Sequence, residues 1–135
     1  MTFKLNIVTP SKRLVADGDL KEVFVPAHRG ELNILPGHAP LVSTLTEGVL
    51  KYQLEGSSTL QAVAISWGYV EVTPNGVNIL AETAESKTEI DLERAKQALK
   101  AAEDYLNKPD ASPEDIEKYH RKRLRAEARI EVAQG

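Results

Sequence analysis

The hydrophobic periodicity of this 135-residue chain changes near Glu85, and the change limits which folds the two halves can adopt. Before Glu85, apolar residues alternate with polar ones and turn residues recur at short intervals, as half-buried strands require. After it, the composition shifts to Ala, Lys, Arg, Glu and Leu, with no glycine before Gly135. We therefore predict a β + α chain, with an all-β sandwich or barrel over residues 1–85 and a helical domain over residues 86–135.

Two turn sequences identify the clearest strand pairs of the first half. Strands predicted at 50–54 and 59–66 flank the sequence Glu-Gly-Ser-Ser, which favours a β-hairpin. Strands predicted at 69–72 and 77–80 flank Thr-Pro-Asn-Gly, in which Asn-Gly adopts positive φ at low cost. Both pairs should be antiparallel.

The first helix is predicted over about residues 90–107. Thr88, with Asp91 three residues later, predicts a capping box at its start. Pro109 predicts its end, because proline lacks the amide hydrogen and disfavours helix in the residue before it. The apolar stripe of this helix consists of Leu92, Ala95, Leu99, Ala102 and Leu106.

A second helix is predicted over about residues 113–133, so that the two form an antiparallel hairpin. Ser112 is the expected N-cap and Pro113 the first helical residue. Arg123 interrupts the apolar stripe, which indicates that this helix also contacts another surface. Because both stripes are narrow and rich in alanine, the hairpin should be marginally stable and able to open. The stripe of the second helix consists of Ile116, Tyr119, Ala126, Ile130 and Ala133.

Composition excludes several classes of protein. The chain has no cysteine, so it contains neither a disulfide nor a thiolate metal site, which fits a reducing compartment. An aromatic content of 5% is too low for nucleic-acid binding by base stacking, so the core should be mainly aliphatic. No apolar run approaches the roughly 20 residues of a membrane-spanning helix. Membrane association is therefore expected only through partners.

Three sequence motifs, in this order, resemble those of one family. The stretch 30–41, Gly-Glu-Leu-Asn-Ile-Leu-Pro-Gly-His-Ala-Pro-Leu, resembles the signature loop of the epsilon subunits of F-type (rotary, proton-translocating) ATP synthases. The stretch 67–72, Trp-Gly-Tyr-Val-Glu-Val, is similar to the family's glycine-containing strand. The stretch 90–95, Ile-Asp-Leu-Glu-Arg-Ala, matches its helical-domain motif. The resemblance extends over essentially the whole chain and is to the bacterial type.

The resemblance implies a fold, a function and a set of partners. The fold would be an N-terminal antiparallel β-sandwich that binds the gamma subunit and the c-ring, followed by the helical hairpin. The function would be that of a non-catalytic central-stalk (rotor) subunit, which couples proton translocation to ATP synthesis. The hairpin would extend towards the beta and alpha subunits to inhibit ATP hydrolysis. The location would be peripheral, at the cytoplasmic face of the bacterial inner membrane.

The resemblance also assigns two loop residues to contacts with partners. Glu31 corresponds to the family's c-ring contact and His38 to its gamma contact. From the residues alone, the favoured interpretation is that Glu31 is a solvated surface glutamate and that His38 shapes a tight loop, because most loop residues carry no function. Metal binding by His28 and His38 is not expected, because no third ligand stands at a credible spacing and His120 lies on another element.

A strongly basic stretch occupies the second helix. It would be a solvated helix face, or, by the resemblance, a contact for an acidic segment of the beta subunit. Nucleic-acid binding is the rival interpretation, but the whole chain has a net charge of −3 and contains no groove-reading motif. The basic residues are Lys118, Arg121, Lys122, Arg123, Arg125 and Arg129, among which Glu127 is the only acidic residue.

The resemblance further implies a regulatory ATP site, although no cofactor is required. In several bacterial members the helical-domain motif joins arginines of the second helix to bind ATP and hold the hairpin closed. Guanidinium groups suit phosphates because they donate in a planar fork and keep their charge. Ala101 departs from the pattern, because ATP-binding members have an arginine there. Asp91 and Arg94 also have a structural interpretation, as helix-start residues. The implied ATP-binding residues are Glu85, Ile90, Asp91, Arg94, Ala95, Arg125 and Arg129.

Two alternative functions remain to be weighed. The chain contains no GxxxxGK[ST] loop, nucleophile elbow or HExxH motif, so catalysis by the chain itself is not expected. A free-standing adaptor, whose sandwich and helices bind unrelated proteins, is the other alternative. Such an adaptor would not co-purify with gamma and the c-ring.

Overall fold

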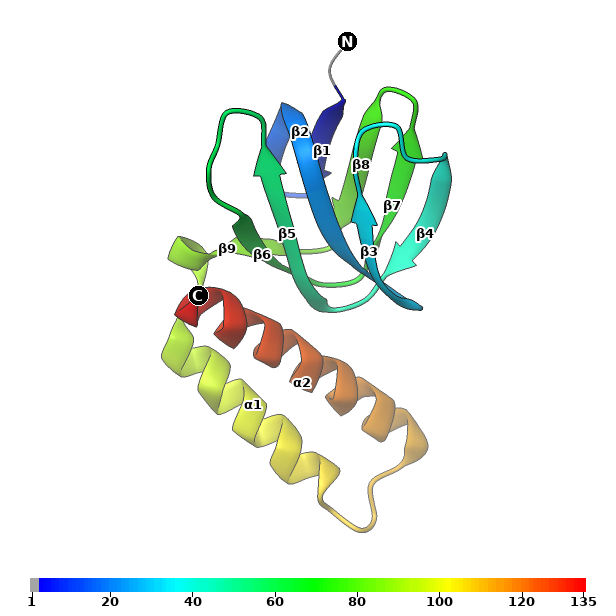
Figure 1. The fold of residues 1–135 in the computed structure, drawn as a ribbon. Coiled ribbons are helices and arrows are strands. Elements are labelled where there is room, and N and C mark those ends of the chain that lie inside the picture. The colour runs from blue at the N-terminus through cyan, green and yellow to red at the C-terminus, as the bar shows by residue number, and fades with distance from the viewer. Residues whose placement is uncertain (1–2) are drawn as a thin grey trace.

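The computed structural model describes residues 3–135, so the first two residues of the predicted 1–85 domain lie outside the described part of the chain. In that part, a β-rich N-terminal body is followed by a 3-10 turn and two α-helices (Figure 1). The elements are β1 (Lys4–Val8), β2 (Arg13–Ala27), β3 (Gly30–Ile34), β4 (Leu41–Leu45), β5 (Gly48–Leu54), β6 (Gln61–Ile65), β7 (Gly68–Thr73), β8 (Gly76–Ala81), β9 (Ala84–Ser86), η1 (Lys87–Glu89), α1 (Leu92–Leu106) and α2 (Pro113–Gln134).

The long strand β2 joins the two layers of the β-sandwich. The strand order is β1-β8-β7-β4-β2-β5-β6-β9, with β3 paired to β2 and β1 paired to both β8 and β2. The first half of β2 pairs with β1, and its second half pairs with β5 and β3. Irregular register in the β1 and β5 pairings, together with the positive φ of 50° at Asp17, accompanies this change of partners. All pairings are antiparallel except that of β1 with β8.

Aliphatic side chains from both layers fill the sandwich. Leu5, Ile7, Val25, Leu50 and Ile79 are completely buried, and their alternation with exposed residues along each strand matches a two-layer core. Phe3 is the one aromatic residue among the buried members of this cluster in the described chain. The prediction of a mainly aliphatic core is therefore confirmed.

Both predicted hairpins are present. β5 pairs with β6 and β7 pairs with β8, each in antiparallel register. In the second turn Gly76 adopts a φ of 155°, whereas Asn75 does not have positive φ. A Cβ at Gly76 would lie 2.0 Å from the carbonyl oxygen of Lys4 on the neighbouring strand, so only glycine fits there.

The start of α1 differs from the predicted capping box. Asp91 is not the partner of Thr88 but is itself the N-cap, and its carboxylate accepts a hydrogen bond of 3.1 Å from the amide of Arg94. The capping-box interaction lies one turn earlier, at η1, where the Glu89 carboxylate accepts from the Ser86 amide and hydroxyl (3.2 and 2.8 Å). The capped 3-10 turn η1 ends at Glu89 and α1 has its own N-cap, so α1 begins at Leu92 rather than at 90.

The second helix begins as predicted, but its buried face is different. Ser112 is the N-cap, with its hydroxyl accepting from the Asp115 amide at 3.2 Å. Ile116 is 45% exposed, so its place in the predicted stripe was wrong, because α1 ends before it can cover that position. Ala128 and Val132, outside the predicted stripe, are instead buried against Ala64 of β6.

The hairpin lies across one end of the sandwich, with α2 between α1 and the strands (Figure 1). α2 therefore buries two faces: Ala126 and Ala128 are both buried, and the latter packs on the sandwich. Lys51 of β5 adds an ion pair to Glu131 of α2 at 3.8 Å. Among the helices of residues 3–135, none combines the length and apolarity needed to cross a membrane.

Candidate functional site

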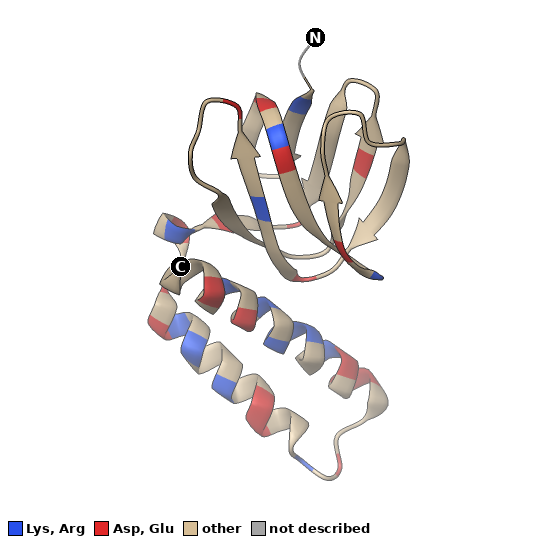
Figure 2. Cartoon of the chain, in the orientation of Figure 1, with Lys and Arg blue, Asp and Glu red and all other residues tan. Residues whose placement is uncertain are grey.

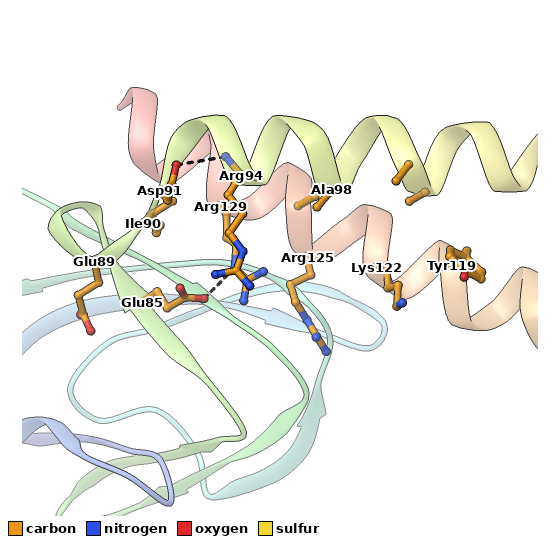
Figure 3. A pocket seen from close by; sticks show the side chains of 14 residues that line it. Glu85, Glu89, Ile90, Asp91, Arg94, Ala98, Tyr119, Lys122, Arg125 and Arg129 are labelled. Carbon is orange, nitrogen blue, oxygen red and sulfur yellow. Dashed lines mark hydrogen bonds and ion pairs between the residues drawn. The ribbon is translucent and has the colours of Figure 1, made fainter.

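A hollow of about 470 Å³ lies where the hairpin meets the sandwich (Figure 3). It is formed by β9, η1 and the facing sides of α1 and α2. All seven residues that the sequence assigned to an ATP site line this one hollow, although up to 44 residues separate them in the chain. They are Glu85, Ile90, Asp91, Arg94, Ala95, Arg125 and Arg129.

The two helices contribute different side chains to the hollow. On α1, Arg94 lines it near the start of the helix, and Ala98, Ala101 and Ala102 line it further along, so the rest of this wall is close to the backbone and uncharged. On α2, Lys122, Arg125 and Arg129 line it, at spacings of three and four residues that place them on one face. The hollow exists because small residues face large cationic ones.

Some of the charged side chains that line the hollow already form ion pairs. Arg129 donates from Nε to the Glu85 carboxylate at 2.7 Å, and both side chains are about three-quarters buried, with 29% and 26% exposed. Glu89 lines the hollow, but it pairs with Lys12 of the sandwich, which does not line it. That hydrogen bond from Lys12, followed by those from Ser86, lowers the pKa of Glu89 to about 2.

Arg125 differs from Arg129 in its partners. Its Nε is buried and has no hydrogen-bond partner within residues 3–135. A buried donor without a partner is rare in native structures and is often explained by a bound ion or ligand. With Lys122, Arg125 also borders a second hollow of about 140 Å³, whose other lining residues are Lys118, Arg121 and the buried Glu47 of the β4–β5 turn.

The residues of the predicted basic face, on α2, differ in how far they are exposed (Figure 2 shows the charges along α2). Lys118, Arg121 and Lys122 are exposed, whereas Arg123, Arg125 and Arg129 are half-buried. Arg123 pairs with Glu127 at 3.5 Å. In this closed arrangement, therefore, only part of the face is presented to solvent.

An aromatic pair closes the far end of the hollow. Tyr119 lines it and stacks on Tyr105 of α1, with ring centroids 3.9 Å apart. The Tyr105 hydroxyl donates to the Asp115 carboxylate at 2.7 Å, which raises the pKa of Tyr105. The ammonium of Lys122 lies 4.8 Å from the centre of the Tyr119 ring.

Sequence reasoning missed part of this site. Tyr119 and Lys122 had been placed in the apolar stripe and the basic face, and helical spacing from Arg125 could have brought Lys122 into the site. No local signal identified Glu89, because its partner Lys12 is 77 residues away.

Glu31 and His38 lie at opposite ends of β3. Glu31 is exposed at the start of the strand, opposite Pro26, and lines a hollow shared with α2. His38 is half-buried in the following loop, which Figure 1 places at the end of the sandwich away from the helices. Its Nδ1 lies 2.7 Å from the Ala39 carbonyl oxygen. Within the described chain, no group of three or more His, Cys, Asp or Glu side chains is placed to hold a metal ion.

One face of the sandwich carries exposed apolar residues. Tyr69 of β7 is opposite Thr44 of β4 and Leu80 of β8, so the three share a face. Tyr69 is 43% exposed and Leu80 is 39% exposed, and Trp67, just before β7, is 54% exposed. With Val8 and Pro10, these three residues line a shallow hollow of about 390 Å³.

The fold is similar to that of subunits in two solved assemblies. A chain in the structure of the Euglena gracilis mitochondrial ATP synthase (OSCP/F1/c-ring) superposes with a TM-score of 0.73 at 23% identity, covering 98% of this chain and 78% of that one. A chain in the Tetrahymena thermophila mitochondrial ATP synthase structure (central stalk/c-ring) gives a TM-score of 0.67 at 15% identity, covering 98% and 97%. At these identities the likeness shows the fold.

Sequence comparison shows the family. Residues 2–87 match the β-sandwich domain of the ATP synthase delta/epsilon chain, and residues 88–134 match its long α-helix domain. The ATP synthase epsilon chain of Bdellovibrio bacteriovorus is 46% identical over 134 residues, covering 99% of this chain and 96% of that protein. That of Geotalea uraniireducens is 41% identical over 131 residues, covering 97% and 93%. The chain therefore belongs to the ATP synthase delta/epsilon chain family.

Proposed function

We propose that this chain is a central-stalk subunit of a bacterial F-type ATP synthase, which couples proton translocation to ATP synthesis and inhibits ATP hydrolysis through its C-terminal helices. One observation carries the proposal: a firmly packed sandwich bears a hairpin whose buried apolar attachment is small. Ala64, Ala128 and Val132 form the buried part of that attachment. Such a role requires a sandwich that stays bound to the rotor and a hairpin that can detach from the sandwich.

The apolar face of the sandwich supports gamma as the rotor partner. Trp67, Tyr69, Leu80 and Val42, the last 69% exposed on β4, form an apolar surface of the kind that marks protein contacts. His38 lies in the loop that leads into β4, the strand that carries Val42. The c-ring contact is assigned to Glu31, an exposed carboxylate at the other end of the sandwich.

The basic face of α2 supports the inhibitory role. In the closed state four of its cations border a hollow around Glu47. When the hairpin opens, these cations move away from Glu47 and are available to acidic segments of the beta and alpha subunits. The subunit itself performs no catalysis in this proposal, and its membrane location, at the cytoplasmic face of the inner membrane, is provided by its partners.

The hollow between hairpin and sandwich supports regulation by ATP. Four cations line it, and both helices and β9 contribute to it, so a ligand there would contact both sides of the moving joint. A ligand that binds only the closed state stabilises that state. Bound ATP is therefore proposed to hold the hairpin down and to permit hydrolysis.

Removing the hairpin from the assembled complex tests the proposal. A chain ending at Glu85 should still co-purify with gamma and the c-ring, and the complex should hydrolyse ATP faster than the complex with the full chain. Unchanged hydrolysis would remove the inhibitory role and leave only coupling. Failure of the full chain to co-purify with gamma and the c-ring would favour the free-standing adaptor.

A further inference from the structure

The hollow between hairpin and sandwich, called the nucleotide hollow below, is lined by more cations than there are free carboxylates to neutralise them. Of its three acidic residues, Glu85 is paired with Arg129 and Glu89 with Lys12. The third, Asp91, caps the amide of Arg94. In the described chain, Arg94, Lys122 and Arg125 line the hollow and form no ion pair.

These unpaired charges lie mainly on α2. Lys122 and Arg125 are three residues apart, which corresponds to about 4.5 Å along a helix and to neighbouring positions on one face. Arg129, which is paired with Glu85, follows four residues later, so like charges repeat along this face and the two unpaired ones lack an anion. The opposite wall is formed by α1, where Arg94 stands at one end and alanines follow it, so the alanine part leaves room for an elongated ligand without adding charge.

Lys122 is exposed at the outer end of this row, and its ammonium lies over an aromatic ring. Its ammonium lies 4.8 Å from the centre of the Tyr119 ring, and that ring is fixed by its stack on Tyr105. Lys118 is a useful contrast, because its ammonium lies 5.9 Å from the same ring but the residue does not line the nucleotide hollow.

We propose that Lys122 is a phosphate-binding residue of this site, forming with Arg125 and Arg94 a row of cations that accepts the polyphosphate of a nucleoside triphosphate. The inference rests on the proposed regulation by ATP and deepens it. In this chain α2 supplies the charge that Ala101 on α1 does not. Lys122, which belongs to the basic face expected to contact the beta subunit, therefore has a second role while the hairpin is closed.

The test compares two charge-removing variants of the full chain by calorimetric titration with ATP and with AMP. Lys122→Gln should weaken ATP binding about tenfold, the effect of losing one charge-assisted phosphate contact. Lys118→Gln, one turn away and in contact with the same ring, should bind ATP within about twofold of the unmodified chain. AMP, with one phosphate, cannot span the row, so the loss for AMP should be smaller than for ATP. Circular dichroism would confirm equal helix content.

The possible failures are distinguishable. If the unmodified chain binds no ATP at millimolar concentration, the proposed regulation by ATP fails and this inference with it. If that chain binds ATP but Lys122→Gln binds equally well, only the role of Lys122 is refuted. An equal loss for ATP and AMP would also refute it, because Lys122 would then act on the hairpin through Tyr119 rather than on the phosphates.

Discussion

Shortening Val132 to alanine tests how weakly the hairpin is attached. Val132 is 3% exposed and packs with Ala64 and Ala128 in the one buried apolar cluster that joins α2 to the sandwich in the described chain. It is the largest buried member of that cluster. Val132→Ala should therefore remove more docking contact than any other single aliphatic substitution in α2.

The size of the effect follows from the atoms removed. Valine to alanine deletes two methyl groups, and each buried carbon contributes roughly 0.8 kcal/mol, so docking should weaken by about 1.5 kcal/mol. This corresponds to about a tenfold rise in the ratio of open to docked hairpin. Alanine has the higher helix propensity, so α2 itself is not weakened by the change.

Hydrogen–deuterium exchange measures this ratio for each part of the chain. Amides of α1 and α2 should exchange about tenfold faster in Val132→Ala, because short helices released from tertiary contact are marginal in water. Amides of the sandwich core, for example in β7 and β8, should be unchanged. Ile116→Ala is the matched control, since it also shortens an aliphatic side chain of α2 but at a position that is 45% exposed.

Two results would refute the reasoning. Hairpin exchange in Val132→Ala that equals that of Ile116→Ala would show that the cluster does not hold the hairpin. Faster exchange throughout the sandwich as well would show that hairpin and sandwich unfold as one unit. In that case a hairpin that opens by itself, on which the inhibitory role depends, would not exist in the isolated chain.

Two further predictions concern single contacts. The pKa of Glu89 falls from 4.5 to about 2, chiefly through Lys12, so this pair stabilises the fold above pH 4.5 and its contribution is lost as the pH falls towards 2. Urea unfolding should show Lys12→Met less stable than the unmodified chain at pH 6 and equal to it near pH 2; a gap that persists at pH 2 would contradict the assignment. Tyr105→Phe removes the hydroxyl that donates to Asp115 but keeps the ring on Tyr119, and should weaken the closed hairpin by about 1 kcal/mol in exchange measurements. An unchanged exchange rate would show that the stack alone holds this end.

Local signals predicted much of the fold. Turn residues located the β5–β6 and β7–β8 hairpins, because a tight turn restricts the residues that can occupy it. Ser112 located the start of α2 for the same kind of reason. The path of β2 was not predictable from alternation. It changes partners along its length, and the irregular register near Asp17 and Gly18 interrupts the two-residue period.

Contacts between distant elements account for what was missed. The buried face of α2 includes Ala128 and Val132 because a sandwich strand lies against them, and no pattern within the helix shows where that strand lies. The pairing of Lys12 with Glu89 depends in the same way on how the joint folds back on the sandwich. The residues that line the hollow could be named from the sequence because the family resemblance names them; helical spacing alone gives a row of cations without its opposite wall.

The small docking contact makes control by a ligand energetically feasible. A fully buried valine contributes about 1.5–3 kcal/mol, and alanines contribute less, so the buried apolar part of the attachment is worth only a few kcal/mol. A ligand present at a hundred times its dissociation constant, binding only the closed hairpin, adds about 2.7 kcal/mol. That is comparable with this apolar part and is about half of the 5.5 kcal/mol needed to move a 1:99 population to 99:1. If leucines replaced the alanines along this contact, the hairpin would stay closed with or without nucleotide. A sparse alanine-lined interface would therefore allow occupancy of the cationic hollow to decide the position of the hairpin, as the proposed regulation requires.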